Sequence, residues 1–418
     1  MSNSLLRTLT GLKGNPRACV YTEPLWGLSM NLCLPYASVY MLAIGLNDSQ
    51  IGLVATAFTL SQVVFAFLSG PITDKLGRRK ATALFDLIAW SIPCIIWWRA
   101  ENFWYFLAAA LLNGTMQIPT NSWDCLLIED VEKSQITRVN SLAGVAAQFS
   151  VFFAPISAIL FSRLTLVPAV RILYLNALVI MTLKVTLLYM FSHETAMGKI
   201  RLEESRGKSI FSLASGYGGV IKIIGSSPGT IFAIIITTIV GIVGMINNTF
   251  WQVIVNKKLL VPDPLLPVFP VIRSAVAIIF LFLIAPHLTR GKLKSPLLTG
   301  FTCYLIGQTL LIFAPIQGPL KYIILCTSLI FDAFAGANLF MLAKSLVALH
   351  INPEERARVH AIMNLIIMAA TAPFGWIGGI LSDISRNLPF VLNLCLLAAG
   401  ICVTIIFYFK EHQNEKHS

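Results

Sequence analysis

Two charged residues lie deep inside apolar stretches of the sequence, where an ionised side chain is costly. Arg273 and Asp332 fall near the middle of runs that are long enough to cross a bilayer at about 1.5 Å of rise per helical residue. Charges at that depth usually mark a solute or ion pathway. We therefore interpret both as leading candidates for contact with a solute or a proton, with Asp332 as the group that titrates. The alternative is a permanent structural ion pair between two packed helices.

Further charges lie nearer the ends of their apolar runs, on the side assigned below to the cytoplasm. They are Glu23, Asp86, Asp124, Lys184 and Lys344. Among them, Glu23 and Asp124 are kept as candidates for solute binding or proton coupling, because a carboxylate inside a membrane helix is a functional hypothesis by default.

Other kinds of chemistry find little support in the residue pattern. The six histidines lack the spacing of metal ligands, so we expect no metal site. The segment from Gly207 to Ser209 ends like a phosphate-binding loop, but Leu202 stands where that loop requires its first glycine. The sequence therefore predicts neither an enzyme nor a bound cofactor.

The elements that must hold the candidate residues are membrane-spanning helices. Of the 418 residues, 56% are hydrophobic and only 12% are charged, whereas a soluble protein is about 25% charged. Apolar runs of roughly 20 residues recur along the chain with short polar interruptions. They predict an all-α membrane protein of about twelve transmembrane helices, near residues 18–44, 50–70, 81–98, 103–126, 140–162, 167–191, 229–254, 264–286, 295–316, 321–349, 357–382 and 388–409.

The longest polar interruption lies at the centre of the chain and predicts two bundles. We expect an N-terminal six-helix bundle at 1–192, a cytoplasmic linker at 193–228 and a C-terminal six-helix bundle at 229–418. An internal repeat supports this division, since Arg138 and Arg356 are each followed 17 positions later by a proline in an Ala-Pro pair. Parallel repeats of this kind place a solute site between the halves, near the midplane of the membrane.

The distribution of basic residues predicts the orientation. An even number of spans puts both termini on one side, and that side holds about three times as many Lys and Arg as the other. The net charge of +12 is explained in this way without any nucleic acid. We expect a monomeric, multi-pass protein of the cell membrane, with both termini in the cytoplasm.

One segment between the second and third expected spans carries an ordered motif. It contains Gly70, Asp74, Gly77, Arg78 and Arg79. Glycines let a backbone turn tightly and approach a neighbouring helix, while Asp74 can accept hydrogen bonds from a helix N-terminus and pair with Arg78. The alternative is that the basic residues serve only as a topology signal that contacts anionic lipid.

This motif resembles the signature loop of the major facilitator superfamily, G-x-x-x-D-[RK]-x-G-R-[RK]. The resemblance implies two pseudo-symmetric six-helix bundles over essentially the whole chain. It also implies that Gly70, Asp74, Gly77, Arg78 and Arg79 form a conformational gate that latches the cytoplasmic side. The weaker second copy, Ala285 to Lys294, has Thr289 in place of the acid, so we expect an asymmetric gate.

The resemblance also implies that the first, fourth, seventh and tenth helices line the cavity. Applied to this sequence, it adds polar and aromatic candidates for solute contact: Glu23, Asn31, Tyr36, Asn113, Gln117, Asn121, Asn247, Asn248, Trp251, Gln252 and Asn338. Such side chains suit an uncharged or zwitterionic organic solute. Hydrogen bonding between packed helices would produce the same pattern, so both interpretations stay open.

Together these features predict a secondary transporter that moves a small organic solute by alternating access. The expected partners are the solute, protons or another coupling ion, and the lipid bilayer, and we favour export slightly over uptake. The alternatives are an uptake permease for a sugar or metabolite, and a receptor or helper protein that kept the fold without transport. A channel is disfavoured, because no ring of pore-lining charges or carbonyl filter is visible.

Overall fold

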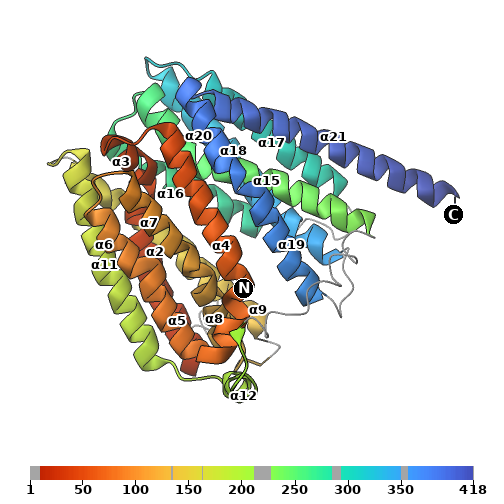
Figure 1. Ribbon diagram of the computed structural model, residues 1–418. Helices are drawn as coiled ribbons and strands as arrows, with labels where there is room; N and C mark the ends of the chain where they lie inside the picture. The colour runs from red at the N-terminus through yellow and green to blue at the C-terminus, as the bar shows by residue number, and fades with distance from the viewer. Residues whose placement is uncertain are drawn as a thin grey trace. The chain divides into compact units, whose positions relative to one another are not determined.

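The computed structural model describes residues 10–132, 135–161, 163–210, 227–284, 293–349 and 356–417. Within these ranges every regular element is a helix (Figure 1). The predicted all-α fold class is confirmed. The chain forms two compact units: the first is Met1–Leu46 with Ala57–Ser215, and the second is Asn47–Thr56 with Gly216–Ser418.

Ten helical stretches in the described part of the chain are long and apolar enough to cross a bilayer. They are Asp48–Leu76, Arg78–Trp98, Arg138–Phe161, Leu166–Phe191, Pro228–Lys258, Asp263–Ile284, Lys294–Ile312, Leu320–Ala343, Ile362–Ile384 and Leu388–Lys410. Each matches one of the predicted spans, with ends that differ by several residues.

The first and fourth predicted spans are also helical, but each is interrupted and richer in polar side chains. The first consists of α2 (Gly14–Cys33), a 3₁₀ turn (Leu34–Tyr36) and α3 (Ala37–Ala43). The fourth consists of α7 (Phe103–Asn113), a 3₁₀ turn (Gly114–Met116) and α8 (Gln117–Ile128). A proline at the first turn removes a backbone donor, which explains the interruption there. With the ten apolar stretches, these two bring the described helices to the number expected.

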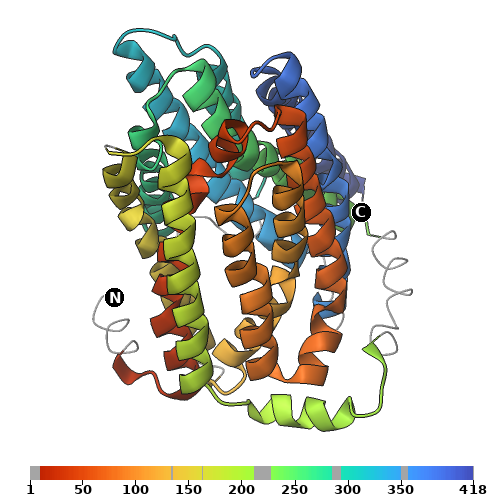
Figure 2. The same cartoon turned by 60° about the vertical axis from the view of Figure 1, so that its left-hand side comes forward.

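The first unit is a bundle whose long helices run side by side (Figure 2). Its remaining elements are α4 (Asp48–Leu76, which begins in the second unit), α5 (Arg78–Asp86), a π turn (Leu87–Ser91), α6 (Ile92–Trp98), α9 (Ile136–Phe149), a 3₁₀ helix (Ser150–Ser157), α10 (Ala158–Phe161), α11 (Leu166–Phe191) and α12 (Ala196–Glu204). Helix α2 packs against α9 and α11, and α5 packs against α8. Gly27 is required where α2 meets the 3₁₀ helix that follows α9, because an added Cβ would lie 1.8 Å from the Ser150 Oγ.

The second unit contains α15 (Pro228–Val253), a π turn (Ile254–Lys258), a 3₁₀ turn (Asp263–Leu265), α16 (Val268–Ile279), a π turn (Phe280–Ile284), α17 (Lys294–Ile312), α18 (Leu320–Leu349), α19 (Arg356–Thr371), α20 (Pro373–Ile384) and α21 (Leu388–His417). Helix α15 begins where Ser227 accepts a hydrogen bond from the Thr230 amide and Pro228 presets the backbone. The core buries apolar faces of α15, α17, α18, α19 and α21, with Phe301 and Leu339 at its centre. Phe232 stacks on Phe407 with ring centroids 4.0 Å apart.

Two expectations fall partly or wholly outside the described residues. The predicted linker, 193–228, includes 211–226, and the weaker second motif with Thr289 lies within 285–292 except at its last two residues. The described start of the linker contains α12, which lies crosswise at one end of the first unit (Figures 1 and 2). The domain boundaries after 192 and 228 stay predictions.

Candidate functional site

Asp332 lies on α18 against α17 and is almost inaccessible, with 3% of its surface exposed. Its Oδ2 accepts a hydrogen bond of 2.7 Å from Gln308 Nε2, while Oδ1 has no partner among the described residues. The two helices come close because α17 has a glycine here: a Cβ on Gly307 would lie 2.3 Å from Asp332 Oδ1. Asp332 therefore has one carboxylate oxygen that accepts a hydrogen bond and one that accepts none from the described residues.

Gln308 joins Asp332 to a wider network of buried polar side chains. Gln308 Nε2 also donates to Asn247 Oδ1 at 3.3 Å, and its Oε1 accepts from Asn393 Nδ2 at 3.1 Å. Asn247 Nδ2 donates to the Tyr304 hydroxyl at 2.9 Å. All five side chains are buried. The network therefore connects α15, α17, α18 and α21 through polar contacts alone.

Sequence reasoning found part of this network and missed the rest. Asn247 and Asp332 were candidates, but Tyr304, Gln308 and Asn393 were not, because the resemblance places their helices outside the cavity. A signal was present: Gln308 and Asn393 are isolated amides within long apolar runs, and such groups must find a partner when they are buried.

Arg273 lies on α16, half-buried, and its contacts differ from those expected of a structural pair. The described ion pairs do not include it, although Asp332 lies within electrostatic range. Its guanidinium carbon instead lies 5.5 Å from the centroid of the Trp251 ring, which packs edge-on against Phe269 at 5.1 Å. The alternative of a permanent ion pair between Arg273 and Asp332 is thus wrong for this structure.

The residues around Arg273 leave hydrogen-bonding capacity unused. Trp251 is only 2% exposed, yet its indole Nε1 has no acceptor within the described residues. The neighbouring Gln252 has a buried Oε1 that no described residue reaches with a donor. Buried polar atoms without partners are rare in folded proteins, so each needs an explanation.

In the first unit, two intramembrane charges contact each other directly. Lys184 on α11 and Asp86 on α5 form an ion pair at 2.5 Å, with side chains only 4% and 6% exposed. Glu23 lies within electrostatic range of Lys184, Asp86 and Asp124. The side chain of Glu23 is half-buried and that of Asp124 is exposed.

Three further candidates are engaged in contacts between helices. Asn31 Nδ2 donates to Ser150 Oγ at 3.4 Å, and Asn113 Nδ2 donates to the Ala89 carbonyl at 2.7 Å. The Tyr36 hydroxyl lies 3.2 Å from Ser157 Oγ. For these residues the contacts favour the interpretation of helix packing over that of solute contact.

Asn338 Nδ2 similarly donates to the Pro296 carbonyl at 2.9 Å, and Asn121 Nδ2 donates to Thr73 Oγ1 at 3.3 Å. Gln117 is half-buried and Asn248 is exposed, and neither side chain has a hydrogen-bond partner among the described residues. These two remain available for solute contact.

The motif at Gly70 to Arg79 is mostly helical rather than a loop. Helix α4 continues through Gly70 to Leu76, the chain turns at Gly77, and α5 begins at Arg78. Gly77 has φ +82°, which a side chain would disfavour, and an added Cβ would lie 2.5 Å from Glu194 Oε2. Among the described residues, no atom outside α4 lies within 4 Å of a Cβ built on Gly70.

The arginines of the motif join neighbouring helices of the first unit. Arg78 is buried, and its Nη1 pairs with Asp74 at 2.8 Å, as expected, while its Nη2 pairs with Glu129 on the turn after α8 at 3.1 Å. Arg79 donates to the Tyr189 carbonyl at 2.7 Å and lies 4.0 Å above the Tyr189 ring.

Glu194 occupies a role that sequence reasoning gave to Asp74. Its carboxylate accepts the backbone amides of Arg78 at 2.9 Å and Arg79 at 3.2 Å, the first turn of α5. There it satisfies two free donors and the positive end of the helix dipole. Ser205, after α12, donates to the Asp74 carbonyl at 3.1 Å. The motif thus fixes α12 to the ends of α4 and α5.

A second cluster, which sequence reasoning missed, joins the start of α4 to α20 within the second unit. Asp383 accepts the backbone amides of Asp48 and Ser49, each at 3.0 Å, and so caps α4. Asp48 in turn accepts from Ser382 at 2.6 Å and lies 3.5 Å from Arg386.

Below this cap the two helices meet backbone to backbone, a contact that we call the glycine seam. A Cβ on Gly52 would lie 2.2 Å from the Gly375 carbonyl oxygen, and one on Gly379 would lie 2.6 Å from the Asp48 carbonyl oxygen. The available signal was the repeat of small residues at Gly375, Gly378 and Gly379, typical of close helix packing in membranes.

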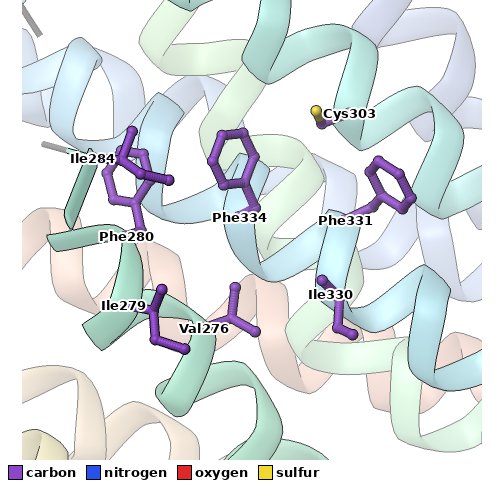
Figure 3. Close-up of a pocket in the computed structure, with 8 residues that line it drawn as sticks. All are labelled: Val276, Ile279, Phe280, Ile284, Cys303, Ile330, Phe331 and Phe334. Atoms are coloured by element: carbon purple, nitrogen blue, oxygen red, sulfur yellow. The ribbon is translucent and has the colours of Figure 1, made fainter. Parts of the chain in front are cut away.

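The second unit also has an apolar pocket of about 530 Å³ (Figure 3). Its lining comes from α16 with the following π turn, α17 and α18: Val276, Ile279, Phe280, Ile284, Cys303, Ile330, Phe331 and Phe334. Phe280 and Phe334 meet edge to face with centroids 5.4 Å apart. A pocket with this lining suits hydrocarbon, and it offers no partner for the charged part of a solute.

Comparisons with known proteins agree with the fold. The chain is 29% identical to the uncharacterized MFS-type transporter YqjV of Bacillus subtilis (strain 168) over 34% of its own length and 36% of that protein. It is 31% identical to the quinolone resistance protein NorA of Staphylococcus aureus over 21% of its length and 22% of NorA. The chain thus matches about a third or less of these curated relatives.

The crystal structure of the nucleoside transporter NupG has the same fold, with a TM-score of 0.71 at 13% identity over 94% of this chain and 98% of NupG. The sequence model of the Major Facilitator Superfamily matches residues 25–261. Since that match covers more than half of the chain, the protein belongs to the Major Facilitator Superfamily.

Proposed function

We propose that this protein is a secondary transporter, which moves a small organic solute across a membrane by alternating access and draws its energy from a proton or other ion gradient. Family membership supports transport in general. The observation that carries the proposal is the pair of intramembrane charges, Arg273 and Asp332, which form no ion pair with each other. A charge held in a membrane without a counter-ion costs stability, which selection tolerates where the charge has a function.

Asp332 is the proposed coupling residue. An ionised carboxylate can only accept hydrogen bonds, whereas a protonated one can also donate. Gln308 has both an amide donor and a carbonyl acceptor, so its side chain can rotate to follow the change at Asp332. Because Gln308 also bonds Asn247 and Asn393, the protonation of Asp332 is linked to contacts on α15 and α21.

The proposed cytoplasmic gate consists of Gly70, Asp74, Gly77, Arg78 and Arg79. Its support is the density of charge-assisted contacts that hold the ends of α4, α5 and α12 together. At the opposite end of α4, the Asp383 cap and the glycine seam supply a second tightly packed contact. Alternating access requires contacts of this kind to form in one state and break in another.

The preference for export remains slight, and the name of the relative NorA, a quinolone resistance protein, points the same way. Uptake is the second candidate, and it is favoured by Arg273, which has no ion-pair partner among the described residues and can bind an anionic solute. The proposed setting is the cell membrane, with a monomeric chain and both termini in the cytoplasm. A receptor or helper protein on the same fold is the alternative from another class.

The test is transport by the purified chain in proteoliposomes. A thermal-shift screen first identifies solutes that raise the melting temperature, because a ligand that binds only the folded state stabilises it. We then expect saturable counterflow of such a solute, and an effect of an imposed pH gradient that Asp332→Asn removes. Glu101→Gln, at an exposed acid on the turn before α7, is the matched control that should leave the pH effect intact.

The result that would overturn the proposal is a well-folded protein that drives no flux of any solute that it binds. Binding without flux would favour the receptor or helper alternative. A flux that does not saturate as the solute concentration rises would favour a channel.

A further inference from the structure

Arg273 is half-buried at the centre of its span, near the eleventh of the 22 residues in Asp263–Ile284. A guanidinium at that depth cannot face hydrocarbon without a large cost, so its exposed part must meet a water-filled space. None of the described ion pairs satisfies it. A permanent positive charge therefore lies at the middle of this span with part of its side chain exposed.

Trp251 adds a second donor next to this charge. The Arg273 guanidinium lies 5.5 Å from the Trp251 ring centroid, which holds the arginine against the aromatic ring. The indole N–H of Trp251 is buried and has no acceptor among the described residues. A planar fork of donors beside a free N–H fits a group that is negatively charged and accepts several hydrogen bonds, such as a carboxylate or a phosphate.

The charge on Asp332 decides how strongly Arg273 attracts such a group. Asp332 interacts with Gln308 and Tyr304 on α17 and with Arg273 on α16, and the next side chains of the network are Asn247 on α15 and Asn393 on α21. Of these only Arg273 is charged. An ionised Asp332 offsets the positive charge, whereas a protonated Asp332 leaves it free to attract an anion.

We propose that Arg273, held against Trp251, binds an anionic group of the solute, and that this anion and a proton on Asp332 bind together. The inference rests on the proposed transport function and narrows its substrate class to organic anions. Anion and proton binding then strengthen each other by the same factor, because linkage is reciprocal. A carrier that holds both together moves them in the same direction, so under this inference an inward proton gradient drives uptake, the second candidate direction, rather than export.

The first experiment measures which charge class binds. Melting temperatures of the purified full chain are recorded with benzoate and other monocarboxylates, with phosphate monoesters, and with the neutral amide or alcohol and the ammonium counterpart of each. We expect stabilisation by anions only, lost in Arg273→Gln and partly retained in Arg273→Lys, which keeps the charge but not the planar fork. Lys257→Gln, at an exposed lysine in the turn after α15, is the charge-matched control and should bind like wild type.

The second experiment measures the linkage to protons. For an anion found in the first step, we expect binding to be roughly 5- to 150-fold tighter at low pH than at high pH, the usual range of coupling between two sites. Comparing about pH 6 with about pH 8 keeps a carboxylate probe ionised throughout. Asp332→Asn should bind tightly at both values, and the uptake of protons on binding, seen with a dye in weak buffer, should disappear.

Each result decides between the two proposals. Stabilisation mainly by neutral or cationic compounds, or by no anion in the panel, overturns the inference, as does anion binding that survives Arg273→Gln. Weaker anion binding at low pH, or unchanged pH dependence in Asp332→Asn, overturns the joint binding of anion and proton. Flux of a neutral solute without anion binding would support the transport function and contradict the inference. Anion binding without flux would support the anion site and contradict the transport function. If Arg273→Gln fails to fold, Arg273→Lys with the pH measurement still decides.

Discussion

Each of the two units contains a pair of one basic and one acidic side chain on adjacent membrane helices, yet the two pairs are built differently. Lys184 and Asp86 in the first unit are in direct contact at 2.5 Å and almost inaccessible. Arg273 and Asp332 in the second unit interact across a distance, and each contacts a neutral group, Trp251 or Gln308. We call the first pair closed and the second pair open.

The difference indicates which charges are available for function. Removing either member of a closed pair leaves the other buried without compensation, so the pair acts as a unit and supports the fold. Members of an open pair keep separate partners, so one can gain a proton or a ligand without forcing the other to move. The pairs also differ in depth, because Asp86 and Lys184 lie nearer the ends of their apolar runs than Arg273 and Asp332 do.

The largest expected effect tests whether the closed pair is structural. Lys184→Met leaves Asp86 buried without its counter-ion, with Glu23 and Asp124 nearby adding negative charge, and should lower the free energy of unfolding by about 3–5 kcal/mol. Denaturation of the purified protein measures the loss. The double variant Lys184→Met with Asp86→Leu should recover most of it. A single variant within about 1 kcal/mol of wild type would show that the pair contributes little.

The second prediction concerns Asp383, a charge held by backbone amides. Asp383→Ala removes the cap from the first two amides of α4 and should cost about 1 kcal/mol in the free energy of unfolding. Asp383→Asn, which keeps an acceptor, should cost less. Equal losses for the two variants would show that the carboxylate charge matters more than the cap.

The third prediction tests the open pair by stability as well as by transport. Asp332→Asn retains the acceptor for Gln308 and removes a costly buried charge, so the free energy of unfolding should change by less than about 1 kcal/mol in either direction. The pH dependence of transport should nevertheless be lost. A destabilisation as large as that of Lys184→Met would mean that the open pair is structural after all.

The smallest expected change in stability lies at the cytoplasmic motif. Asp74→Asn breaks one ion pair of Arg78 while Glu129 retains the other, and the cost should be about 0.5 kcal/mol. If the motif is a gate, turnover should fall while solute affinity stays near that of wild type. A change in affinity with normal turnover would contradict the gating role.

Much of the fold could be predicted from the sequence because the bilayer imposes long apolar runs. The charges near the centre of their spans, and the Asp74–Arg78 pair four residues apart across the turn between α4 and α5, were also predictable, since both depend on spacing along the chain. The contacts of Asn31, Tyr36 and Asn113 were not, because a polar side chain points to a cavity or to a neighbouring helix according to how its own helix is rotated. Glu194 caps α5 from 116 residues away, a distance at which no local pattern operates.

At the glycine seam, no side chain of the described residues lies between α4 and α20 that could change its rotamer when the helices move. Elsewhere, flexible side chains can absorb a small displacement by changing rotamer, but at Gly52, Gly375 and Gly379 one backbone lies directly on the other. Such a contact cannot loosen by degrees. It is either formed or broken, so this end of α4 should have only two states. A single methyl group added at one of these glycines would keep the two helices apart.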